Sequence, residues 1–96
     1  MNRVKNDLVC EIIRLSQTNL LNKKKVESGD KSENEVVVNW IRLNAARYRE
    51  DFKDYLESYS PSELGDMLNE LTLSKKDLSE ILVNYPQKKS IPKTLE

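Results

Sequence analysis

Residues 60–82 have the sequence Ser-Pro-Ser-Glu-Leu-Gly-Asp-Met-Leu-Asn-Glu-Leu-Thr-Leu-Ser-Lys-Lys-Asp-Leu-Ser-Glu-Ile-Leu. The stretch contains two helix-start signals in succession. Ser60 is a helix N-cap, proline follows at the first helical position, and Glu63 completes a capping box. Ser74 repeats the pattern with Asp77, and Pro86 predicts the end of that second helix. The stretch therefore predicts two short helices joined by a tight turn.

A longer helix is predicted upstream of this pair. Ser32 and Glu35 form a possible capping box, with Asn34 as a competing cap, and the helix is expected to continue to about Ser58. One face of this helix carries a stripe of apolar residues at helical spacing. These predicted core residues are Val37, Ile41, Ala45, Tyr48, Phe52, Tyr55, Leu56 and Tyr59.

The first helix is predicted from about Asn2 to about Asn22. Its apolar residues cover roughly half of its circumference, which indicates either a central helix packed between two others or a partly intermolecular surface. We expect a flexible loop over residues 22–34 and a disordered tail over residues 87–96, because both are rich in polar residues. The predicted fold is all-α: a single small four-helix domain over residues 1–86, with two longer helices followed by a short helix-turn-helix-like pair.

Composition limits the classes of function. The chain has 96 residues, equal numbers of basic and acidic residues, no histidine and one cysteine, Cys10. Acidic residues outnumber basic ones by 11 to 6 over residues 32–85, which argues against wrapping of nucleic acid. A single cysteine allows no internal disulfide, and no apolar run is long enough to cross a membrane, so we expect a cytoplasmic protein without a membrane partner.

Catalytic motifs are not evident in the sequence. Without histidine the commonest proton-transfer group is missing, and Cys10 has no histidine to activate it. The carboxylates from Glu50 to Glu57 alternate with Arg47, Arg49 and Lys53, which predicts a solvent-exposed face with salt bridges rather than a metal site. We therefore predict no enzyme activity, no metal and no cofactor.

A second apolar row exceeds what a simple bundle needs. Val36, Trp40 and Leu43 are spaced at i, i+4 and i+7, and Arg47 extends the row about 100° away from the core stripe. Either the first helix packs on this row, or the row is exposed and binds a protein. Trp and Arg are enriched among interface hot spots, so these four residues are the predicted protein-interaction site. The surplus of apolar surface also predicts a homodimer, formed through the first helix or through this row.

Two functions remain open on these grounds. The leading hypothesis is a non-enzymatic protein-interaction module: a small regulator, adaptor or inhibitor that binds another protein of unknown identity. The alternative is a helix-turn-helix transcriptional regulator, because residues 60–82 resemble that motif in outline. The predicted DNA-reading helix would run from Lys75 to Tyr85 and would offer Lys75, Lys76 and Asn84. It has no arginine, the commonest reader of guanine, and it lies in the acidic segment.

The same stretch is similar to a family of very short Arg-rich bacterial proteins. Their pattern is Leu-Ser-x-x-x-Leu-x-Asp-Ile-Gly-Leu-Ser-x-x-Asp-Ile, and an extra turn here, 68–71, interrupts it. The matching residues are Ser60, Leu64, Asp66, Met67, Leu73, Ser74, Asp77 and Leu78. The resemblance carries no catalytic residue and implies no function.

Overall fold

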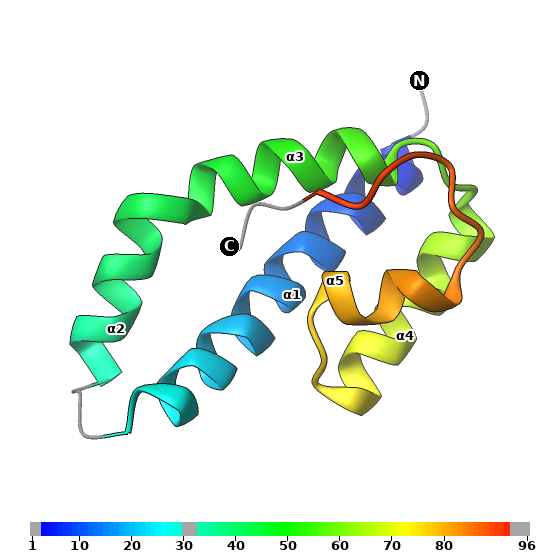
Figure 1. Cartoon of the computed structure of the whole chain (residues 1–96). Helices are drawn as coiled ribbons and strands as arrows, with labels where there is room; N and C mark the ends of the chain where they lie inside the picture. Colours follow the sequence, from blue (N-terminus) through cyan, green and yellow to red (C-terminus); the bar gives the residue numbers. More distant parts are fainter. Residues whose placement is uncertain (1–2, 30–32, 93–96) are drawn as a thin grey trace.

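The computed structural model describes residues 3–29 and 33–92, and it is helical throughout its regular structure (Figure 1). The helices are α1 (Arg3–Ser28), α2 (Glu33–Trp40), α3 (Ala46–Leu56), α4 (Pro61–Ser74) and α5 (Leu78–Ile81). A π-helical turn, η1 (Ile41–Ala45), links α2 to α3, and a 3-10 turn, η2 (Leu82–Asn84), follows α5. No strand occurs within the described residues, so the predicted small all-α fold is confirmed.

Helices α2, η1 and α3 form one continuous helix, because the residues at both junctions keep right-handed helical dihedral angles. With this helix counted once, the described chain has four helices. Figure 1 shows that α2 is inclined to α3 and that the direction changes at η1. The predicted division into two longer helices and a short pair is not confirmed, since α4 has 14 residues and α5 has four. None of the described helices combines the length and apolar character that a membrane crossing requires.

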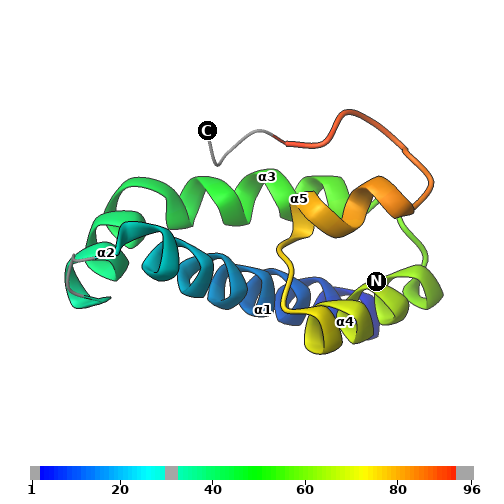
Figure 2. The same ribbon diagram turned by 60° about the horizontal axis from the view of Figure 1, so that its bottom comes forward.

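Helix α1 lies between the other elements and contacts α2, α3 and α4 (Figures 1 and 2). Its buried residues include Val9, Ile12, Ile13 and Leu20, which fits the central position that a wide apolar face predicts. The predicted helix end near Asn22 is wrong, because α1 continues to Ser28. Most of the predicted 22–34 loop therefore belongs to helices. Residues 30–32, including the proposed cap Ser32, lie outside the described residues.

The start of α4 is the one that the sequence predicts. The Ser60 hydroxyl accepts a hydrogen bond from the Glu63 amide at 3.2 Å, and the Ser60 amide donates to the Glu63 carboxylate at 2.9 Å. Pro61 is the first helical residue. Lys75 is the C-cap that follows the last helical residue. It has a φ of 60°, and its amide donates to the Leu71 carbonyl.

The start of α5 corrects the prediction. Asp77, not Ser74, is its N-cap: the Asp77 carboxylate accepts from the Glu80 amide at 3.0 Å. Ser74 is the last residue of α4, and its hydroxyl donates to the Glu70 carbonyl at 2.7 Å. The reading helix predicted from Lys75 to Tyr85 is therefore wrong, because only Leu78–Ile81 are α-helical.

The C-terminal segment runs back along α3 in both views (Figures 1 and 2). Lys89 forms an ion pair with Asp54 of α3 at 3.1 Å, and Ile91 packs against the core. The segment 87–96 was expected to be disordered, but residues 87–92 make these defined contacts. Residues 93–96 lie outside the described residues.

The π-turn changes which face of the long helix is buried. In an uninterrupted α-helix Trp40 and Tyr48 would be about 80° apart around the axis. A π-turn accommodates about one extra residue, which removes roughly 100° and brings the two side chains to within about 20° of each other. Their rings indeed pack edge to face, with centroids 5.7 Å apart. Ile41, predicted to be in the core, is instead 53% exposed.

Candidate protein-interaction surface

A groove of about 300 Å³ lies between the end of α1 and the α2–η1 segment. Three of the four predicted interaction residues, Val36, Trp40 and Leu43, line it together. The other lining residues are polar or charged: Lys24, Glu27, Glu35, Asn39 and Asn44. Arg47 is exposed on α3 but does not line this groove. The predicted row is therefore brought together in part.

The three residues differ in burial. Trp40 is only 4% exposed and packs on Tyr48, whereas Val36 is half-buried and Leu43 is 67% exposed. The row was expected either to be covered by the first helix or to be exposed. Trp40 is covered within the chain, and Leu43 is exposed. Trp40 belongs to the core, and Leu43 is the apolar side chain of the row that a partner can reach.

The indole of Trp40 carries an unusual cost. Its Nε1 is buried and has no hydrogen-bond acceptor among the described residues. A buried donor without a partner costs about 1–3 kcal/mol. The edge-to-face contact with Tyr48 and the burial of the large ring offset part of that cost. The wall of the groove at Trp40 is therefore stabilised by packing alone.

Three exposed apolar side chains belong to the helical segment that forms one side of this groove, and one of them, Leu43, lines it. Val38, Ile41 and Leu43 are 62%, 53% and 67% exposed, and all three belong to α2 or η1. We name these three residues the α2–η1 patch. The other large apolar residues with high exposure are scattered over the described chain: Val4, Val26, Leu73 and Val83.

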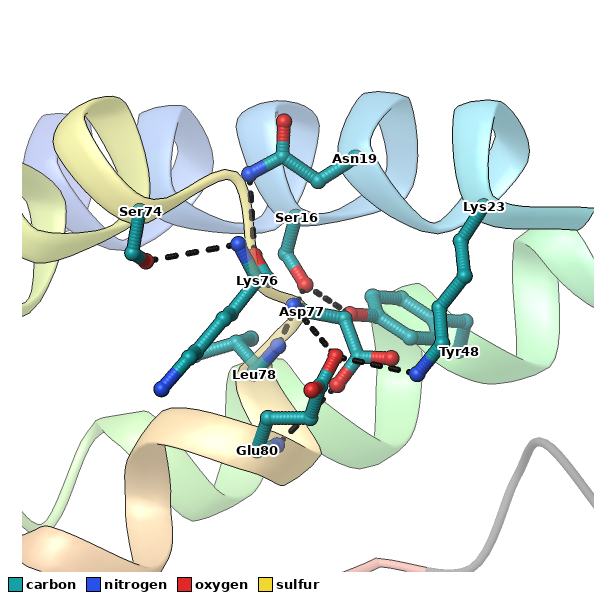
Figure 3. Close-up of polar contacts among 9 residues, drawn as sticks. All are labelled: Ser16, Asn19, Lys23, Tyr48, Ser74, Lys76, Asp77, Leu78 and Glu80. Carbon is teal, nitrogen blue, oxygen red and sulfur yellow. Dashed lines mark hydrogen bonds and ion pairs between the residues drawn. The ribbon is translucent and has the colours of Figure 1, made fainter. Parts of the chain in front are cut away.

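A buried polar junction connects the middle of α1 to α3 and to the start of α5 (Figure 3). The hydroxyl groups of Ser16 and Tyr48 are hydrogen-bonded, and the Leu78 amide donates to the Ser16 hydroxyl at 2.8 Å. The Asn19 side chain donates to the carbonyls of Leu71 and Lys76 at 3.1 and 2.9 Å. The junction joins α1, α3, α4 and the start of α5.

Charged groups surround the cap of α5 at this junction. Lys23 of α1 forms an ion pair with Glu80 at 3.1 Å, and Glu80 also accepts from the Asp77 amide (Figure 3). Burial raises the pKa of Asp77 above its ordinary value, although its hydrogen bond from the Glu80 amide opposes this shift. Burial likewise raises the pKa of the Tyr48 phenol, so Tyr48 stays protonated at neutral pH. The geometry is that of a structural joint held by buried hydrogen bonds.

Sequence reasoning missed Ser16 and Asn19. The available signal was their spacing, because they follow Ile12 at i+4 and i+7 and so continue the buried face of α1. Polar residues on such a face predict buried hydrogen bonds.

The residues of the DNA-binding alternative are exposed but do not share a helix. Lys75 and Lys76 lie in the connection between α4 and α5, and Asn84 lies in η2. Lys75 and Lys76 border a depression that Lys23 and Glu80 also line. The role of these residues in DNA binding stays a prediction, and the helix that would present them to a groove of DNA is not formed.

Neither a metal site nor a similar known protein identifies a further function for this surface. Within residues 3–29 and 33–92 no group of three or more acidic, cysteine or histidine side chains is placed to hold a metal ion. Comparison of the chain with protein families, with curated proteins and with solved structures finds no significant match.

Proposed function

We propose that this protein is a non-enzymatic interaction module, a small regulator, adaptor or inhibitor, and that it binds another protein through the α2–η1 patch and the adjoining groove. The observation that supports the proposal is the concentration of exposed Val38, Ile41 and Leu43 within one stretch of helix. Leu43 also lines the groove together with Val36 and Trp40, and exposed apolar groups gathered at one place mark interaction surfaces.

The position of the patch supports the same proposal. It includes a π-helical turn, and such turns occur frequently at functional sites. The groove beside it has an apolar wall at Val36 and Trp40 and a rim that carries both signs of charge, at Lys24, Glu27 and Glu35. An apolar centre with a polar rim is the usual anatomy of a protein interface. Arg47, two residues beyond η1, would extend this rim.

The test compares two substitutions of the same residue type. Leu43→Asp places a charge in the patch, whereas Leu73→Asp places it on α4, where the leucine is 75% exposed. Each tagged variant and the wild type would capture partners from the native host, with quantitative mass spectrometry as the readout. We expect a partner that wild type and Leu73→Asp retain and that Leu43→Asp loses by more than about tenfold, since an interface hot spot can contribute at least 2 kcal/mol. Equal capture by all three proteins, or capture that salt abolishes together with bound DNA, would contradict the proposal.

A second copy of the chain is one partner that the patch could bind. The homodimer stays a prediction. Fewer surfaces are candidates for its interface, because the α1 face and Trp40 are largely covered within the chain. Sedimentation velocity at micromolar concentration, again with Leu43→Asp and Leu73→Asp, would measure it. A dimer that Leu43→Asp alone dissociates would place the contact at the patch.

A further inference from the structure

A second groove lies between α1 and α3, away from the α2–η1 patch. Its volume is about 410 Å³, and its apolar lining includes Ile13, which is itself only 3% exposed, together with Cys10. Arg14 stands on the α1 side, and Arg49, Glu50 and Lys53 stand on the α3 side. The groove thus combines an apolar floor with charged walls contributed by two helices.

Positive charge predominates on these walls. The side chains of Arg49 and Lys53 are exposed and form no hydrogen bond or ion pair with any residue in the described part of the chain. They are four positions apart, so both project from one face of α3. Arg14 is held by Glu11 through two contacts of 2.8 Å, and Glu50 is the one carboxylate among the lining residues.

One carboxylate of α3 forms its ion pair outside its own helix. The carboxylates between Glu50 and Glu57 were expected to pair with the basic residues of their own helix. Asp54 instead pairs with Lys89 of the C-terminal segment at 3.1 Å. Helix α3 therefore presents two cations without an ion-pair partner to the groove, and the Asp54 carboxylate is held elsewhere.

We infer that this groove is a docking site for an acidic segment of a partner protein, with an apolar side chain on Ile13 and Cys10 and carboxylates at Arg49 and Lys53. Charge complementarity identifies the occupant, because the walls supply unpaired cations and the floor supplies apolar area. The inference goes beyond the proposed function, since the groove shares no lining residue with the α2–η1 patch. A chain with two separate docking surfaces would act as an adaptor.

Cys10 makes the inference directly testable. It is the single cysteine of the chain, it is exposed, and it lines the groove. An occupant should therefore slow its alkylation by iodoacetamide, which intact-protein mass spectrometry measures. The probe is a short synthetic peptide of alternating glutamate and leucine, and the control peptide has glutamine in place of glutamate.

We expect the glutamate peptide to slow alkylation of Cys10 by about tenfold at saturation and the glutamine peptide to leave the rate unchanged. Arg49→Gln combined with Lys53→Gln should weaken the peptide by several-fold to about tenfold, the range for two solvent-exposed charge pairs. Lys75→Gln combined with Lys76→Gln removes the same charge elsewhere and should leave the affinity unchanged. Salt should weaken the wild-type complex in the same direction, which tests the charge dependence without any substitution.

Three results would overturn the inference. These are an unprotected Cys10 at saturating glutamate peptide, equal protection by the glutamine peptide, and equal loss of affinity in the two double variants. Each of them leaves the result at Leu43 unaffected, so failure here is distinguishable from failure of the proposed function.

Discussion

The two halves of the long helix 33–56 differ in how they are held. In α3 the side chains of Tyr48, Phe52, Tyr55 and Leu56 are all at most 1% exposed. Among the side chains of α2 and η1 that the structure describes, only Trp40 is buried, and the three residues of the α2–η1 patch are more than half exposed. One continuous helix thus serves as a core element at one end and as an exposed apolar surface at the other. Periodicity alone does not show where the first role ends and the second begins.

The difference has a structural origin. The buried hydrogen bond from Ser16 and the ion pair from Lys89 both reach α3. The other half packs on α1 and, through Trp40, on Tyr48. The Gln17 side chain also donates to the Ala45 carbonyl at 3.2 Å. The π-turn lies where these two sets of contacts meet. It allows Trp40 and Tyr48 to share one face while the residues between them turn outward.

The strongest test of this division is a pair of single-residue deletions. Deletion of Arg42 shortens the π-turn and should leave an ordinary α-helix with Trp40 and Tyr48 still aligned. We expect it to cost about 1 kcal/mol or less, as exposed changes usually do. Deletion of Glu50 should rotate Tyr48 by about 100° away from Phe52, whose ring centroid lies 4.6 Å from that of Tyr48.

The Glu50 deletion should therefore cost about 4 kcal/mol or more, which is a large fraction of the stability of a domain of this size. Urea denaturation followed by circular dichroism measures both variants, and Trp40 fluorescence shows whether the indole stays buried. Similar losses from the two deletions would mean that η1 is not an accommodated extra residue.

A second test removes the polar contact that holds α3 against α1 and α5. Ser16→Ala leaves the Leu78 amide without its acceptor and the Tyr48 hydroxyl without its partner. Each such group costs about 1–3 kcal/mol when buried, so we expect a loss of unfolding free energy of at least about 1 kcal/mol. Thr18→Ala is the control on the same helix, because its exposed hydroxyl bonds only the Arg14 carbonyl. Equal midpoints for the two variants in urea would show that the junction adds no stability to the anchored half.

The smallest expected effect is a pH dependence of the unfolding free energy, caused by the Asp77 carboxyl group of the polar junction. Burial raises the pKa of Asp77 in the folded chain, so the folded state holds this proton more tightly than the unfolded state does. Stability from this group is therefore lost as pH rises from its ordinary value of 3.8 through the raised folded value. Asn caps helices about as well as Asp and does not titrate.

The unfolding free energy of Asp77→Asn, relative to wild type, should therefore rise across that interval and stay level above it. Urea titrations at a series of acidic to neutral pH values measure this difference. A relative stability that falls with rising pH would show that the Asp77 carboxylate is favoured, rather than penalised, by its surroundings.

Local signals were enough to predict part of the fold. The capping box of Ser60 and Glu63 joins residues three positions apart, so the sequence contains all of its partners. The start of α5 was ambiguous, because Ser74 with Asp77 and Asp77 with Glu80 are overlapping capping boxes. A distant residue decides between them: the Leu78 amide finds its acceptor at Ser16 of α1.

The candidate site was predictable to a similar degree. Val36, Trp40 and Leu43 line one groove, as their helical spacing predicts, although Leu43 lies within the π-turn. Their unequal exposure, and the exposure of Ile41, follow from the extra residue in η1, which no single-sequence periodicity shows. The α1–α3 groove depends on side chains from two helices and on the pairing of Asp54 with Lys89, so tertiary contacts alone define it.

The hydrogen bond between Leu78 and Ser16 also bears on how the chain is made. Its two residues are 62 positions apart, so the first helix to be synthesised completes its polar pairing only when the last one emerges. Until then a growing chain carries Asn19 without its two carbonyl acceptors and Ser16 with Tyr48 as its one partner at this junction. Incomplete chains should consequently remain open to proteases and chaperones, and commitment to the native structure should come late and nearly all at once, as non-local contacts generally impose.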